Sequence, residues 1–327
     1  MKNWKKIISE CIRMMMLLIA VSIMSFVLIV KAPIDPLVSY IGTNSTISEE
    51  ARQEIADEWG LNDPLPERFI TWGEHALKGD LGMSITYKKP VSEVIKTRFS
   101  YSIVLMALSW ILSGVIGFIL GVICGIKEGS LFDRATKVFC LGVKSAPVFW
   151  IGLLVLSVFA VQLGWFPIGM AVPAGTLASE VSIWSRIHHL ILPVLTLTIV
   201  SISEVVLYTR RKVIETMNSN FILYAKVRGE NQKQIIKRHV LKNVLLPAVT
   251  VQFSSFSELF GGMALAETVF AYPGIGTAIT AAATNADVPL LLGISVFSAL
   301  FVFAGNVIAN ILYGVFNPVI REGDNRE

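Results

Sequence analysis

The sequence has few charged residues, which make up 16% of its 327 positions. Soluble domains usually carry about 25% charged residues. Hydrophobic residues make up 54% of the chain and gather in long apolar runs. This composition excludes an ordinary soluble domain and predicts an all-α, polytopic membrane protein. The formal net charge of +4 is poor evidence for nucleic-acid binding, so we expect no nucleic-acid partner.

Cysteine is scarce as well, with only Cys11, Cys124 and Cys140 and no C-x-x-C pair. All three fall in or beside apolar runs, so we interpret them as small packing residues and predict neither a disulfide nor a metal site.

Catalytic motifs are also missing. The chain has no G-x-x-x-x-G-K-[ST] phosphate-binding motif, so it is not expected to hydrolyse ATP itself. It has no H-E-x-x-H motif and no paired intramembrane aspartates, which argues against an integral membrane enzyme.

Six apolar runs are long enough to cross a hydrocarbon core of ~30 Å at ~1.5 Å per residue. The predicted spans lie near 9–30, 101–126, 136–162, 188–209, 243–265 and 288–316. The first run follows Lys2, Lys5 and Lys6 as in a signal peptide, but no A-x-A cleavage site comes after it. We therefore expect an uncleaved first span.

Basic residues predict the orientation, because lysine and arginine collect on the cytoplasmic side. They crowd the N-terminus, the short loop at 127–137 and the long loop at 210–243, whereas 266–287 has none. Both termini are therefore expected in the cytoplasm of a bacterial inner membrane. Residues 1–30 form the cytoplasmic N-terminus and first span, 31–100 an external subdomain, 101–316 a five-span core with a coupling loop at 210–243, and 317–327 a cytoplasmic tail.

The external subdomain carries helix and turn signals. Thr46-Ile47-Ser48-Glu49 predicts a capping box that opens a helix running to Trp59. Asp63-Pro64-Leu65-Pro66 predicts a second helix start, and Gly79-Asp80-Leu81-Gly82 a turn. An apolar stripe then follows at Val91, Val94, Ile95 and Phe99. The stripe is either an elbow along the membrane surface or a helix packed on its own loop.

Residues 218–247, NSNFILYAKVRGENQKQIIKRHVLKNVLLP, form a polar and basic segment between two predicted spans, which we call the docking loop. We expect Asn218 and Asn220 to cap a short helix that ends at Gly229, with a second helix running to Pro247.

Two short helices exceed what a chain reversal needs, so we predict a docking surface for a partner. Phe221 and Tyr224 would anchor it, and the small Ala225 would allow close approach. A solvated basic loop at the lipid headgroups is the alternative.

The docking loop resembles the coupling motif of binding-protein-dependent ABC importer permeases. Ala225-Lys226-Val227-Arg228-Gly229 is followed eighteen residues later by Pro247. The spacing is longer than in the usual motif, and Leu223 and Tyr224 stand where a leading glutamate is common. Both departures are typical of the dipeptide/oligopeptide/nickel branch.

Further segments are similar to the same branch and occur in the same order along the chain. They are 62–65 with 79–84, 147–152 with 163–167, 267–276 and 317–321.

The resemblance implies a pump of two permease chains, two ATPase chains and an external substrate-binding protein, with this chain as the first permease in contact with membrane lipid. The ATPases would bind ATP and Mg²⁺, and this chain no cofactor. Residues implied to couple to the ATPase are Phe221, Tyr224, Ala225, Arg228 and Gly229. Residues implied to build an outer gate, or a purely structural turn, are Glu267, Pro273, Gly274 and Gly276.

Charged residues inside spans are costly and are candidates for function. Lys144, Glu204 and Glu258 are the candidates for the translocation pathway, with Glu258 the best of them. Lys144 instead reaching the interface and Glu204 instead reaching water are open alternatives. Asn306 and Asn310 share a helix face and are expected to form interhelical hydrogen bonds.

The leading interpretation is import of short peptides, with nickel or a metal chelate as the alternative substrate and a motor-independent channel as a more remote alternative. His188 and His189 are adjacent and point about 100° apart on a helix, which is poor geometry for a shared metal ion.

Overall fold

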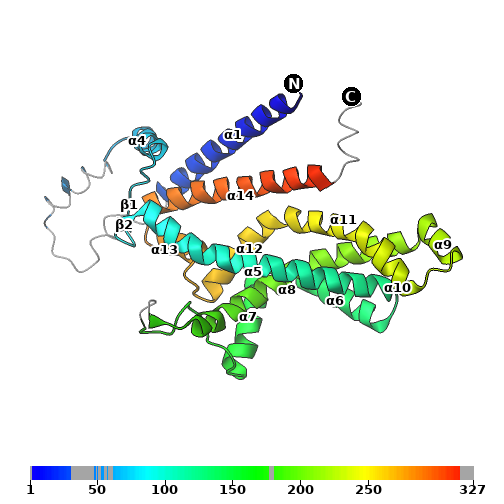
Figure 1. Cartoon of the computed structure of the whole chain (residues 1–327). Helices are drawn as coiled ribbons and strands as arrows, with labels where there is room; N and C mark the ends of the chain where they lie inside the picture. Colours follow the sequence, from blue (N-terminus) through cyan, green and yellow to red (C-terminus); the bar gives the residue numbers. More distant parts are fainter. Residues whose placement is uncertain are drawn as a thin grey trace. The chain divides into compact units, whose positions relative to one another are not determined.

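The computed structural model describes residues 2–30, 62–176 and 180–316, together with positions 48, 50, 53, 54 and 57 (Figure 1). The side chains of α1, Lys2–Val30, are described over 12–28. The predicted capping box at Thr46 to Glu49, most of the helix up to Trp59 and the tail at 317–327 lie outside the described residues.

The chain divides into two compact units. The first comprises Met1–Ser102 and Pro273–Phe303, and the second comprises Ile103–Tyr272 and Ala304–Glu327. Two long helices, α5 at Val91–Ile126 and α14 at Val288–Phe316, contribute to both.

The first unit contains α1, α4 and a hairpin, with α13 and the first part of α14. Helix α4 spans Leu65–Leu77 and starts after Pro64, as predicted. Gly79 and Gly82 have φ of +87° and +83°, which confirms the predicted turn, since glycine adopts this conformation without steric cost. The antiparallel strands β1, Met83–Ser84, and β2, Lys89–Pro90, follow.

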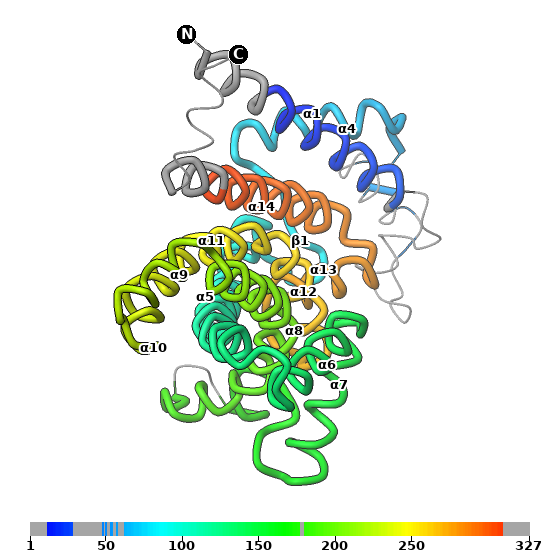
Figure 2. The backbone as a smooth tube through the Cα atoms, turned by 90° about the vertical axis from the view of Figure 1, so that its right-hand side faces the viewer, coloured from blue at the N-terminus to red at the C-terminus, as the bar shows by residue number. Residues whose placement is uncertain are grey.

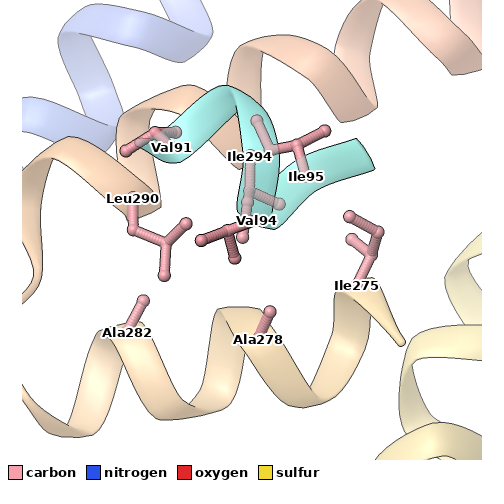
Figure 3. Close-up of a cluster of buried hydrophobic side chains, with 8 residues drawn as sticks. All are labelled: Val91, Val94, Ile95, Ile275, Ala278, Ala282, Leu290 and Ile294. Atoms are coloured by element: carbon pink, nitrogen blue, oxygen red, sulfur yellow. The ribbon is translucent and has the colours of Figure 1, made fainter. Parts of the chain in front are cut away.

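The apolar stripe after the hairpin is part of the core of this unit. Val91, Val94 and Ile95 open α5 and pack against α13, Ile275–Thr284, and the start of α14 (Figure 3). The stripe opens the continuous helix α5 and packs on Leu81 and Tyr87 of the loop before it, so the interpretation of a helix packed on its own loop is right in part, and α13 and α14 cover it as well.

Asp287 fixes the hairpin to the start of α14. Its buried carboxylate accepts hydrogen bonds from the Ser84 hydroxyl at 2.6 Å, the Thr86 backbone N–H at 2.9 Å and the Leu290 backbone N–H at 3.2 Å. The side chain therefore caps α14 and holds the loop in front of it.

The second unit is built around α8, Ile183–Met217. Helix α8 packs against α6, Leu131–Ser145; α7, Val148–Leu156; α11, Leu241–Ser254; and α12, Phe256–Val269 (Figure 2). The π-helix η1, Ser157–Gln162, continues α7. The docking loop contains α9, Asn220–Val227; α10, Gln232–Ile235; and the π-helix η3, Ile236–Val240.

Three glycines of α5 bring it close to α8. A Cβ at Gly117, Gly121 or Gly125 would lie 2.9, 2.6 or 2.5 Å from the Cβ of Val205, Thr209 or Val213, respectively. Small residues at a spacing of four allow membrane helices to approach closely. The spacing of these glycines is a signal in the sequence that could have predicted this close approach.

The described residues contain three continuous helices long and apolar enough to cross a membrane, within α5, α8 and α14. Two bent pairs bring the total to five if each pair is one span. Helix α1 has a shorter described apolar stretch, Ile12–Leu28. The multi-pass helical class is thus confirmed, and the count of six stays a prediction.

The third and fifth predicted spans are not continuous. Helices α6 and α7 meet at 111°, because Pro147 forces Ala146 into an extended conformation with φ −97° and ψ 138°. Helices α11 and α12 meet at 51° at Ser255, whose hydroxyl donates to the Gln252 carbonyl at 3.0 Å. Such side-chain bonds to the backbone often bend helices.

Candidate functional site

A cavity of about 290 Å³ lies where the two bent helix pairs change direction. The first bend contributes Ala146 and Pro147 to its wall, and the second contributes Ser255. Helix α8 contributes further polar residues to the lining, including Ser201 and Ser203. Side chains from helices far apart in the sequence thus share one space.

The cavity brings together all three residues predicted for the pathway. Lys144 lies in the last turn of α6, Glu258 in the first turn of α12 and Glu204 in the middle of α8. None of the three has an ion-pair or hydrogen-bond partner of its side chain among the residues described. Their contact with a substrate stays a prediction.

The helix ends suit the signs of these charges. The C-terminal end of a helix carries partial negative charge, which favours Lys144, and the N-terminal end carries partial positive charge, which favours Glu258. The bends therefore place one cation and one carboxylate at complementary helix ends. The prediction that Lys144 lies inside a continuous third span is wrong, because α6 ends at Ser145 and the chain bends there.

The docking loop folds onto an apolar cluster. Ile222 and Ala225 of α9 are buried with Ile235, Val240 and Val244, and with Val122 of α5 and Val213 of α8. Gly229 has φ +82° and ends α9, as predicted. Asn231 and Gln234 form a capping box that opens α10.

Two details of the predicted docking loop are wrong. Ala225 is only 3% exposed, so it packs against this chain and is not on the face offered to a partner. The N-cap of α9 is Ser219, and Asn218 instead caps the C-terminus of α8. The periodicity of a short helix did not show which side the neighbouring helices would cover.

The exposed face of α9 is aromatic and basic. Phe221 and Tyr224 are 47% and 64% exposed, as predicted for anchoring residues. The Arg228 guanidinium lies 5.8 Å from the centre of the Tyr224 ring, a cation–π contact. Glu230 Oε2 and His239 Nε2 lie 3.1 Å apart and link the turn after α9 to η3.

A buried ion pair that the sequence analysis missed fixes the end of α8 before the docking loop. Arg210 donates from Nη2 to Asp133 Oδ2 at 2.8 Å, and the Gly129 N–H donates to the same oxygen at 2.9 Å. The Asp133 side chain is 0% exposed. The two residues are 77 positions apart, and no local pattern links them.

The predicted outer turn is built differently from the expectation. Helix α12 ends with Ala271 at φ +46°, and the Tyr272 N–H donates to the Glu267 carbonyl at 2.8 Å. The left-handed residue is therefore Ala271, whereas Gly274 precedes α13 and Gly276 lies inside it. Pro273 is half-buried, and Glu267 is fully buried.

The two adjacent histidines bind backbone groups of the preceding loop. His188 Nε2 lies 2.9 Å from the Trp165 carbonyl oxygen, and His189 Nδ1 lies 2.8 Å from that of Gly169. Within the described part of the chain, no cluster of three or more histidine, cysteine, aspartate or glutamate residues has the geometry of a metal site.

Residues 117–322 match the family of binding-protein-dependent transport system inner membrane components. The chain belongs to this family. The permease is 34% identical over 306 residues to the oligopeptide transport system permease protein AppB of Bacillus subtilis, covering 93% of this chain and 95% of that protein.

The permease has further relatives among transport proteins. It is 28% identical over 321 residues to the dipeptide transport system permease protein DppB of Escherichia coli K12, covering 93% and 94% of the two chains. A chain of the MetNI methionine ABC transporter gives a TM-score of 0.48 at 17% identity, covering 68% of this permease and 97% of that chain. The family resemblance drawn from the sequence is confirmed, and the chain is a multi-pass transport component rather than an enzyme.

Proposed function

We propose that this permease is one of two membrane chains of a bacterial ABC importer for short peptides, with both termini in the cytoplasm. The observation that carries the proposal is the cavity at the two helix bends, which gathers three charged residues without partners in the described chain. The relatives named for oligopeptide and dipeptide transport support peptides as the cargo.

The position of the cavity at breaks in helices supports a role in transport. Lys144, Glu204 and Ser255 lie inside the predicted spans at 136–162, 188–209 and 243–265, with Glu204 toward the predicted cytoplasmic end of its span. Binding sites of transporters often lie at breaks in membrane helices.

The energy would come from partner ATPases that bind ATP and Mg²⁺. Phe221 and Tyr224 would contact the ATPase, and the apolar cluster beneath α9 would pass the movement to α8 and α11. The Arg210–Asp133 ion pair would carry it on to α6, one wall of the cavity. A second permease chain, membrane lipid and an external substrate-binding protein complete the proposed assembly.

Uptake in cells that lack only this chain tests the proposal. Labelled dipeptides and labelled nickel, with and without a chelator, are compared before and after the gene is restored. We expect loss of dipeptide uptake alone, recovered on complementation. Loss of nickel uptake with normal dipeptide uptake would contradict the proposal.

A further inference from the structure

The cavity holds both signs of charge on separate helices. Lys144 comes from α6, Glu204 from α8 and Glu258 from α12. Charges at membrane depth are costly unless they are paired or solvated. Lys144 and Glu258 are exposed, Glu204 is half-buried, and none of the three has an internal partner in the described chain, so a ligand with its own positive and negative groups can reach and pair with them.

A short peptide with free ends is such a ligand. It carries an ammonium at one end and a carboxylate at the other, separated by amides that need hydrogen bonds. Ser201 of α8 also lines the cavity and is half-buried, so its hydroxyl is accessible to a ligand. A hydroxyl can donate a hydrogen bond to a peptide carbonyl or accept one from a peptide N–H.

Nickel, the alternative substrate, fits these charges less well than a peptide does. A divalent cation would neutralise the two carboxylates and leave Lys144 without a counter-charge, close to a second positive centre. The volume also limits the ligand, since about 290 Å³ lies at the low end of the ~300–1,000 Å³ typical of ligand pockets. Peptides of two or three residues fit this size.

Building on the proposed import function, we infer that the cavity selects short peptides by their two charged ends. Lys144 Nζ donates to the terminal carboxylate, and Glu204 and Glu258 accept from the terminal ammonium. The permease thus contributes its own selectivity for unblocked peptides, in addition to any selection by an external binding protein.

The test measures peptide binding to the purified complex of both permeases and their ATPases, without the external binding protein. The probes are alanyl-alanine, its N-acetyl form and its C-terminal amide, and saturation-transfer difference NMR reports weak binding. We expect the unblocked dipeptide to bind about tenfold more tightly than either blocked form, the typical effect of losing one charged hydrogen bond.

Variants of the cavity residues test which side chain binds each end of the peptide. Lys144→Met is expected to bind the dipeptide about tenfold more weakly and the amide as the native complex does, so that the two affinities become equal. Glu204→Gln with Glu258→Gln is expected to remove the preference over the N-acetyl form. Unchanged binding of one blocked probe shows that each variant is folded. Lys137→Met in α6 and Glu215→Gln in α8 lie outside the cavity lining and should keep the native preferences.

Equal binding of all three probes by the native complex, no saturable dipeptide binding, or an undiminished preference in Lys144→Met would overturn the inference. Its failure is distinct from failure of the proposed function. If dipeptide uptake requires the chain but binding ignores the terminal charges, only the inference falls. If uptake does not require the chain, the proposed function falls as well.

Discussion

The cavity and the docking loop both belong to the second unit, but they differ in the side chains that line them. Charged residues line the cavity, whereas apolar residues pack beneath the docking loop. Around the cavity, Lys144 and Glu258 have no partners in the described chain. Beneath the docking loop the apolar side chains are packed together, and Glu230 and His239 pair with each other. Exposed charges without internal partners can bind a ligand of opposite charge, whereas close apolar packing lets a segment move as one body.

The largest effect is expected from a bulky side chain placed between α5 and α8, beside the apolar cluster beneath the docking loop. In Gly125→Leu the new side chain would start 2.5 Å from the Val213 Cβ and 3.0 Å from the Arg210 carbonyl oxygen, so α5 and α8 would have to separate. We expect almost no folded protein in the membrane fraction, measured by size-exclusion chromatography in detergent. Gly142→Leu is the control, since a Cβ at Gly142 has no neighbour within 4 Å. Normal yields of both would contradict close packing of α5 on α8.

The next largest effect is expected on transport, with insertion of the chain unchanged, when α9 of the docking loop is altered. Gly229→Pro cannot adopt φ +82° and loses the N–H that donates to the Lys226 carbonyl, so α9 should end differently. We expect the chain to insert normally and peptide transport in proteoliposomes to be abolished. Gly175→Pro also replaces a glycine at positive φ, +79°, but away from the docking loop, and should transport normally. Full transport by Gly229→Pro would argue against coupling through α9.

A smaller effect is expected at the buried ion pair. Asp133→Asn leaves Arg210 without its charged partner, and breaking a pair this buried typically costs about 3 kcal/mol. Thermal unfolding in detergent should therefore shift clearly to lower temperature. Glu215→Gln removes the exposed partner of Lys212 and should leave the unfolding temperature unchanged. Equal shifts in both variants would show that the buried Asp133–Arg210 pair stabilises the fold no more than the exposed Lys212–Glu215 pair does.

The smallest effect concerns the cavity. Glu258→Gln keeps the shape of the side chain and removes one charge that has no partner in the described chain. We expect uptake about tenfold slower with normal assembly and stability, because no internal ion pair is broken. Uptake kinetics identical to those of the native permease would assign Glu258 to packing.

The sequence alone identifies the charged residues that line the cavity, but not both helix bends that bring them together. Lys144, Glu204 and Glu258 were selected because intramembrane charges are costly, which needs no knowledge of tertiary contacts. The bend at Pro147 was within reach of the sequence, since proline disfavours helix at the residue before it. The bend at Ser255 was not, because Ser254, Ser255 and Ser257 are close together and the sequence does not show which of them bends the helix.

Contacts between distant segments limited the other predictions. The face of α9 that carries Ala225 is buried only because α5, α8 and α11 meet there, and no local pattern contains that information. The same holds for Arg210 and Asp133. The left-handed Ala271 at the end of α12 was also not predicted, since glycine is the usual residue at such helix ends.

Thiol labelling of Ser201→Cys tests the central claim, that peptides pass through the cavity, most directly. The variant is made in a background with the three native cysteines replaced, in the assembled complex, and treated with a membrane-impermeant maleimide. Ser201 lines the cavity, whereas Ser145, the site of the control cysteine, does not. We predict that saturating dipeptide slows labelling at position 201 and leaves labelling at position 145 unchanged. Equal labelling of Ser201→Cys with and without dipeptide would contradict the role of the cavity as the peptide path.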